Sequence, residues 1–167
     1  IVSIAFTVFG VFQVRYEEGK QLDELERKAK AVNESLIFSV RNILSNNNIK
    51  SAKLLVESFQ RRERLQGCVI YDKNGKVLAI TERIADWGSS TQKPYIINML
   101  AKKEPRGALE KFGNFSAYSY VLPILDEQEN FLGVSEVVYD TSYVLTTLTG
   151  IWKRLSITLI SLLIVIV

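Results

Sequence analysis

The sequence predicts an α+β fold in which one helix interrupts an antiparallel sheet, with a long helix before the sheet and another helix after it. Three observations support this prediction. An apolar stripe with spacings of three and four residues begins at Leu22 and is typical of one long helix. Four short apolar strand patterns come after it in two pairs. No charged residue occurs in residues 1–14 or 155–167, so the polar part of the chain lies between two apolar ends.

Each apolar end is shorter than the roughly 20 residues that cross a bilayer as a helix. Because each is cut off by a terminus of the chain, we expect both to be parts of longer transmembrane helices, residues 1–14 and 155–167. Trp152, Lys153 and Arg154 precede the second segment as an interfacial anchor would. The first segment lacks the basic region and the cleavage site of a signal peptide, which favours an uncleaved anchor. We therefore expect a fragment of a larger membrane protein.

Residues 15–65 are predicted to form two membrane-proximal helices, one continuous to about Leu44 and a second from Ser51 to about Leu65. The stripe on the first helix consists of Leu22, Leu25, Ala29, Val32, Leu36, Ser39 and Ile43. It has two interpretations: the seam of a parallel dimer, or a face that packs on the sheet or the last helix of the same chain. We expect a coiled-coil dimer stalk, because a stripe that starts at the membrane cannot all face a domain further out.

Residues 66–140 are predicted to form the core of the domain. We expect strands over 68–72 and 77–81, joined by the turn pair Asn74-Gly75, then a loop over 83–92 and a helix over 93–103. Longer strands are expected over 114–125 and 131–139. Asp140 or Thr141 can cap a last helix, residues 141–154, that continues into the second span.

The composition excludes several kinds of chemistry. The chain has no His, which removes Ser-His-Asp and Cys-His pairs and most transition-metal sites. Glycine-rich phosphate-binding motifs are absent, and 21 basic against 18 acidic residues give no nucleic-acid footprint. Cys68 is the single cysteine, in an apolar string where a buried side chain is expected. We predict no catalytic residues, no metal and no cofactor, so we do not expect this fragment to be an enzyme.

Several strings carry a resemblance to a known family: Leu25-Glu26-Arg27-Lys28-Ala29, Arg62-Glu63-Arg64-Leu65-Gln66-Gly67, Tyr139-Asp140-Thr141-Ser142-Tyr143 and Ile151-Trp152-Lys153-Arg154. The chain resembles bacterial extracytoplasmic sensor domains of the single-Cache, PAS-like kind. The resemblance implies a HAMP domain after the second span and an output domain of the histidine kinase or trehalose-phosphate synthase type. We expect a multi-pass protein of the cell inner membrane with residues 15–154 in the periplasm, because a long domain between an amino-terminal anchor and a second span is normally translocated.

A ligand pocket in this fold class lies between the sheet and the interrupting helix. The candidates are Tyr71, Arg83, Trp87, Tyr95, Arg106, Tyr118 and Tyr120. In the functional interpretation, aromatic walls select a small molecule such as a carboxylate or a sugar, and an arginine pairs with its acidic group. In the alternative interpretation, the tyrosines are core rings and the arginines are solvated.

The expected function is ligand sensing by a homodimeric transmembrane receptor, transmitted by a small rotation or piston movement of the last helix. The alternative is a membrane-tethered structural or protein-interaction module that binds no small molecule. A HAMP-like helix pair and a catalytic domain after Val167 would support the receptor, whereas a stop codon soon after the span would support the module. A third interpretation, an extracytoplasmic enzyme, is disfavoured because no catalytic constellation can be placed.

Overall fold

A five-stranded antiparallel sheet in the order β2-β1-β5-β4-β3 forms the centre of residues 26–140. The computed structural model describes residues 2–46, 48–62, 64–88, 94–112, 115–142 and 156–157. These divide into two units, residues 26–140 and a second unit of residues 1–25 with 141–167. The sheet lies wholly in the first unit, which therefore holds the candidate site.

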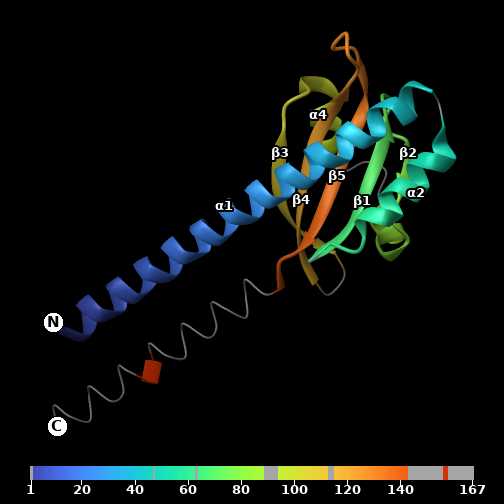
Figure 1. Cartoon of the computed structure of the whole chain (residues 1–167). Helices are drawn as coiled ribbons and strands as arrows, with labels where there is room; N and C mark the ends of the chain where they lie inside the picture. Colours follow the sequence, from blue (N-terminus) through green and yellow to red (C-terminus); the bar gives the residue numbers. More distant parts are fainter. Residues whose placement is uncertain are drawn as a thin grey trace. The chain divides into compact units, whose positions relative to one another are not determined.

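β5 (Phe131–Asp140) lies in the middle of the sheet, between β1 (Leu65–Asp72) and β4 (Phe115–Leu125) (Figure 1). β2 (Val77–Ile80) and β3 (Arg106–Phe112) form the two edges. In the register of the sheet, Glu136 lies opposite Val69 on one side and Val121 on the other. Directly opposed residues share a face, so this row fixes which side chains project to each side.

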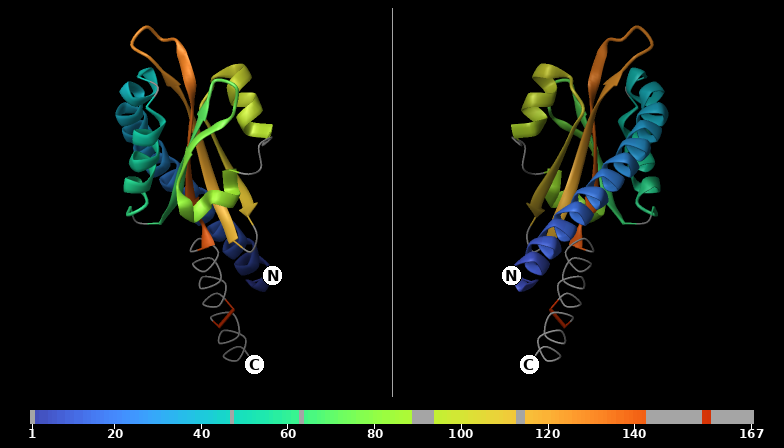
Figure 2. Two further views of the ribbon diagram at one scale, coloured as in Figure 1. Left: turned by 90° about the vertical axis from the view of Figure 1, so that its right-hand side faces the viewer. Right: turned by 90° about the vertical axis from the view of Figure 1, so that its left-hand side faces the viewer.

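Helices cover both faces of the sheet (Figure 2). The part of α1 (Val2–Ser45) beyond residue 25 and α2 (Ile49–Phe59) lie on one side, which we name the α1 face. The short η1 (Glu82–Ile84), α3 (Ala85–Gly88) and α4 (Pro94–Lys102) lie on the other side, the α4 face. The sheet is therefore the middle of three layers, and β5 is buried from Gly133 to Tyr139.

The long first helix is confirmed, since α1 continues without a break to Ser45. Along its outer part, Ala29 and Leu36 of the predicted stripe are fully buried within the single chain, together with Asn33 and Val40. This stretch therefore packs on the chain's own sheet, the second of the two interpretations. The dimer stalk stays a prediction.

The second helix is shorter than expected. It begins at Ile49, where the side chain of Asn48 accepts a hydrogen bond from the backbone N–H of Ser51 at 3.1 Å, and it ends at Phe59. Arg64 then adopts a positive φ of 61°, and β1 starts at Leu65. Gly67 lies inside β1, where a Cβ would come within 2.8 Å of Ile84 and Thr81.

The hairpin β1–β2, the helix α4 and the strands β4 and β5 are confirmed. The Asn74-Gly75 turn has its positive φ, 82°, at Gly75. Two predictions are wrong. Residues 83–88 are helical in η1 and α3 and not a loop, and a fifth strand, β3, occupies residues 106–112. The sequence of β3 lacks a clear alternation of buried apolar and exposed polar residues, since Leu109 is 55% exposed.

Within the described residues, none of the helices combines the length and apolarity required to cross a membrane. Of the expected last helix, residues 141–154, only Thr141 and Ser142 lie within the described residues, and of the expected second span, residues 155–167, only residues 156–157 do.

Candidate functional site

The α4 face carries an apolar core with a polar group at its centre. Val69, Val121, Val134 and Val138 of the sheet pack with Ile84 of η1 and with Ile96 and Met99 of α4. Three polar side chains lie among them: Tyr71 of β1, Ser119 of β4 and Glu136 of β5. We name these three residues the hydroxyl–carboxylate cluster.

The register explains why the three side chains meet. Glu136 lies opposite Val69 of β1 and Val121 of β4. Tyr71 is two residues after Val69 and Ser119 is two residues before Val121, so both are diagonal neighbours of Glu136 on the same face. The Tyr71 hydroxyl donates to one carboxylate oxygen, Oε2, and the Ser119 hydroxyl to the other, Oε1, each at 2.6 Å. Glu136 is 0% exposed, Ser119 1% and Tyr71 3%. The carboxylate is therefore held from both sides in a fixed orientation.

The electrostatics of the cluster are set by this burial. Each oxygen of the Glu136 carboxyl group accepts one hydrogen bond, from Tyr71 or from Ser119. Burial of the Tyr71 hydroxyl, and then the negative charge of Glu136, raise the pKa of Tyr71 far above its usual range, so this phenol stays protonated and donating. Such short bonds to a charged acceptor are among the stronger hydrogen bonds in proteins.

The structure does not bring the predicted tyrosines together. Tyr71 lies on the α4 face, whereas Tyr118 and Tyr120 project to the α1 face. The Tyr118 hydroxyl donates to Glu26 of α1 at 3.2 Å. Burial, together with the charges of Glu26 and Glu34 on α1, raises the pKa of Tyr120. These two rings therefore pack between the sheet and α1, and of the predicted tyrosines whose side chains the structure describes, only Tyr71 lies on the α4 face.

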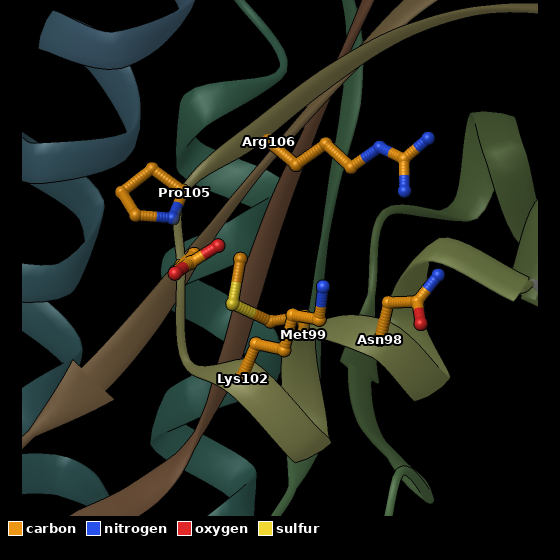
Figure 3. Close-up of a pocket in the computed structure, with 6 residues that line it drawn as sticks. Asn98, Met99, Lys102, Pro105 and Arg106 are labelled. Atoms are coloured by element: carbon orange, nitrogen blue, oxygen red, sulfur yellow. The ribbon is translucent and has the colours of Figure 1, made fainter.

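The two predicted arginines are exposed. Arg83, in η1, donates a long 3.5 Å hydrogen bond to the carbonyl of Leu65. Arg106 begins β3 and borders a small surface pocket (Figure 3). That pocket is lined by Asn98, Met99, Lys102, Glu104, Pro105 and Arg106. Met99 also belongs to the apolar core that contains Tyr71, so it is common to this pocket and that core. The structure does not describe the side chains of the other two candidates, Trp87 and Tyr95.

Glu136 and Ser119 were not among the predicted site residues. A signal for Glu136 was present in the sequence, since it is the only charged residue in the otherwise uncharged string from Phe131 to Tyr139. A lone charge in a strand of that composition is costly to bury unless it is paired. Ser119 gave no such signal, because serine is common on both faces of half-buried strands.

Comparison with known proteins shows the fold. No family model matches the chain, and no curated protein sequence does. Among solved structures, the DcuS sensor domain of E. coli superposes with a TM-score of 0.60 at 21% identity, covering 77% of this chain and 96% of that domain. The chain has the PAS-like fold of extracytoplasmic sensor domains. The expected Cache-like α+β architecture is thereby confirmed.

Two further sensor domains share this fold at lower identity. The sensor domain of the histidine kinase DctB of V. cholerae has a TM-score of 0.59 at 17% identity, over 83% of this chain and 56% of that domain. The sensory domain of the Campylobacter jejuni chemoreceptor Tlp3, solved with isoleucine bound, has a TM-score of 0.60 at 12% identity, over 88% of this chain. The chain spans 64% of that domain, so it is comparable to part of each of these two structures and to nearly all of the DcuS domain.

Proposed function

We propose that this chain is the extracytoplasmic ligand-sensing region of a transmembrane signalling receptor. The observation that carries the proposal is the hydroxyl–carboxylate cluster, a fixed polar group buried on the α4 face of a sensor-type sheet. Ligand sites in proteins are mostly apolar, with a few polar groups that fix orientation. Isoleucine bound to the similar Tlp3 domain supports a small molecule as the ligand.

Transmission would use the connectivity of β5. This strand carries Glu136 and ends at Asp140, immediately before the residues predicted as the last helix, 141–154. A ligand that binds one geometry of the sheet better than another shifts the equilibrium by its differential affinity. Because no flexible linker is evident in the sequence between β5 and the second apolar segment, the shift would reach the membrane as a small rotation or piston movement.

The remaining parts of the receptor are inferred from the sequence. Residues 1–14 and 155–167 would anchor the domain in the inner membrane, with residues 15–154 in the periplasm. The protein would be a homodimer whose cytoplasmic part contains a HAMP domain and an output domain of the histidine kinase or trehalose-phosphate synthase type. The domain itself would bind and not catalyse.

A chimera tests this function. Residues 1–167 are fused to the cytoplasmic region of a histidine kinase that lacks its own sensor, and phosphorylation of its response regulator is measured in membranes with and without periplasmic extract. We expect an output that depends on the extract and that a glycine-rich insertion after Thr147 abolishes. An output that ignores the extract at every concentration would contradict the proposal, and an unchanged output from the insertion variant would contradict the rigid-helix mechanism.

A further inference from the structure

A small pocket lies where the chain turns from the end of α4 into β3 (Figure 3). Its volume is about 130 Å³, and its lining residues all lie in these two elements or in the turn between them. A cavity of about 150 Å³ holds a molecule of the size of benzene. The part of a ligand inside the pocket is therefore limited to a few carbon atoms with their polar groups.

The backbone around the pocket is held by contacts of its own. Lys103 adopts the left-handed conformation, with a φ of 56°, and its N–H donates to the carbonyl of Met99 at 2.8 Å, which ends α4. The Lys103 amine lies 5.3 Å from the centre of the Phe131 ring on β5, a cation–π contact that holds the turn against the sheet. Pro105 fixes the backbone φ immediately before β3 begins. The pocket is therefore formed before a ligand binds.

The pocket is lined by charges of both signs. Lys102 and Arg106 are cations, and Glu104 is an anion. Asn98 adds a neutral amide, and in Figure 3 the side chains of Asn98 and Lys102 rise from α4 towards Arg106. Within the described residues, these four side chains make no hydrogen bond and no ion pair, with one another or with other groups. All four are exposed, so their charges and polar atoms are accessible to a ligand.

We propose that this pocket binds a small zwitterion, a molecule that carries one carboxylate and one ammonium group on a short carbon skeleton. This inference rests on the sensing function proposed above and names its ligand class. The Arg106 guanidinium offers a planar pair of donors that matches a carboxylate, and the Lys102 ammonium adds a further donor. Glu104 accepts from the ligand's ammonium, which the C-terminal end of α4 also favours, because a helix carries partial negative charge at that end.

The mixture of charges favours a zwitterion over a simple anion or a simple amine. A carboxylate without an ammonium group would pair with Arg106 but leave Glu104 as an uncompensated like charge. An amine without a carboxylate would pair with Glu104 and meet two cations. Each of these exposed charges binds weakly by itself. Affinity therefore depends on both ends of the ligand being paired at once.

Met99 connects the pocket to the interior of the domain. It is 2% exposed, and it belongs both to the pocket lining and to the apolar core that includes Tyr71 of β1 and Val134 of β5. A ligand in the pocket therefore contacts a side chain that also packs in this core. A zwitterion that binds one position of α4 better than another would shift the equilibrium between these positions by its differential affinity.

Binding is measured by thermal unfolding of the full chain in detergent micelles. Cys68, the single cysteine, supplies the readout: it is buried, and burial raises its pKa to about 12, so a fluorogenic maleimide reacts only on unfolding. The zwitterions are alanine and β-alanine, and both have the same matched halves, propionate and ethylamine; glucose is the neutral control. At equal concentrations we expect the zwitterions to raise the unfolding temperature, and the two halves and glucose to leave it unchanged.

Affinities for the tighter zwitterion and for propionate are then measured by calorimetry on variants. Arg106→Gln removes the partner of the carboxylate, and we expect it to weaken zwitterion binding roughly tenfold. Glu104→Gln removes the partner of the ammonium, so the affinity for the zwitterion should fall roughly threefold while the affinity for propionate rises. Lys111→Gln and Glu127→Gln remove a cation and a carboxylate at exposed positions outside the pocket, and both should bind as the wild type does.

The outcomes separate the two proposals. Propionate that binds as tightly as the zwitterions would overturn this inference and leave the sensing function intact. Zwitterion binding that is equal in Arg106→Gln, Glu104→Gln and the wild type would overturn the assignment to this pocket. Absence of a shift with every compound would overturn the inference, while an output of the chimera that depends on periplasmic extract would still support sensing. A zwitterion that binds through Arg106 but leaves the output of the chimera unchanged would confirm the pocket and contradict the sensing function.

Discussion

The two faces of the sheet use buried polar groups in different ways. On the α4 face, the Glu136 carboxylate is held by side chains, the hydroxyls of Tyr71 and Ser119. On the α1 face, the amide of Asn33 in α1 donates to backbone carbonyls, those of Tyr120 at 3.0 Å and Ser135 at 3.1 Å. The first arrangement orients a charged group, and the second fastens a helix to the sheet. The polar contacts of the α4 face therefore fix the Glu136 side chain, and those of the α1 face fix α1 against the backbone of β4 and β5.

The two polar groups are one residue apart along the strands. Ser119 and Glu136 point to the α4 face, and the carbonyls that Asn33 binds belong to their chain neighbours Tyr120 and Ser135. A change in the spacing of β4 and β5 on one face therefore acts on the hydrogen bonds of the other. The comparison predicts that variants on the α4 face alter ligand binding, whereas variants on the α1 face alter the attachment of α1.

The largest expected effect comes from Glu136→Met. This change leaves two buried hydroxyls, on Tyr71 and Ser119, without their acceptor. Each buried donor that loses its partner costs about 1–3 kcal/mol, so we expect the free energy of unfolding to fall by about 2–6 kcal/mol. Chemical unfolding followed by circular dichroism measures it.

A triple variant is the control. Replacing the whole cluster by Tyr71→Phe, Ser119→Ala and Glu136→Met leaves no unpaired hydroxyl in the cluster, and we expect stability to return to that of the wild type or to exceed it. A triple variant as unstable as Glu136→Met would show that the cluster serves the stability of the fold, against the functional interpretation of the α4 face.

Asn33→Ala should have the next largest effect. It removes two hydrogen bonds from a fully buried position and leaves a small cavity, so we expect a loss of about 2–3 kcal/mol in the free energy of unfolding. Asn42→Ala, at an exposed position of the same helix, is the matched control. Ligand affinity should remain unchanged in Asn33→Ala, since Asn33 lies on the α1 face. A loss of affinity equal to that of Arg106→Gln would remove the distinction between the faces.

Alkaline pH should lower the free energy of unfolding, and the loss should begin with Cys68 on the α1 face, because its thiol has the lowest ordinary pKa of the buried groups whose pKa is raised. Burial raises the pKa of Cys68 from 9.0 to about 12 and that of Tyr139 from 10.0 to about 12. Because the unfolded chain releases these protons first, their stabilisation is complete below pH 9 and is lost as pH rises from 9 towards 12. For the thiol the slope is about 1.4 kcal/mol per pH unit. Cys68→Ala should flatten the decline between about pH 9 and 10; an identical profile in this variant would assign the decline to other groups.

The smallest expected loss in the free energy of unfolding comes from removing one tyrosine hydroxyl, and it should differ between Tyr71 and Tyr118. Tyr71→Phe removes a 2.6 Å bond to a buried carboxylate and should cost about 1.5–3 kcal/mol. Tyr118→Phe removes a 3.2 Å bond to Glu26 in a partly exposed environment, so we expect about 0.5–1 kcal/mol. The same unfolding measurement on both variants compares the faces directly, and equal losses would contradict the stronger polar group that we assign to the α4 face.

Local patterns predicted most of the elements, and long-range register determined the site. The stripe from Leu25 to Leu36 and the Asn74-Gly75 turn each depend on residues close in sequence, and both are confirmed. The strand β3 was missed because its apolar Leu109 is exposed and its sequence shows no alternation of buried and exposed residues. The cluster depends on Tyr71 and Glu136, 65 residues apart, becoming diagonal neighbours. No local pattern specifies that pairing, so Tyr71 was a candidate while its partner was not.

The position of β5 has a consequence for how the domain folds. The hairpin β1–β2 and the hairpin β3–β4 can each form from residues close in sequence, but only β5 joins them, and it is the last of the five strands along the chain. Its pairing with β1 links residues as distant as Leu65 and Tyr139. Closing such a long loop precedes the contacts that reward it and slows folding. During synthesis, the edges of β1 and β4 that pair with β5 therefore stay unpaired until residues 131–140 have been made. Unpaired strand edges promote aggregation, so we expect the chain to be most prone to aggregate at this stage.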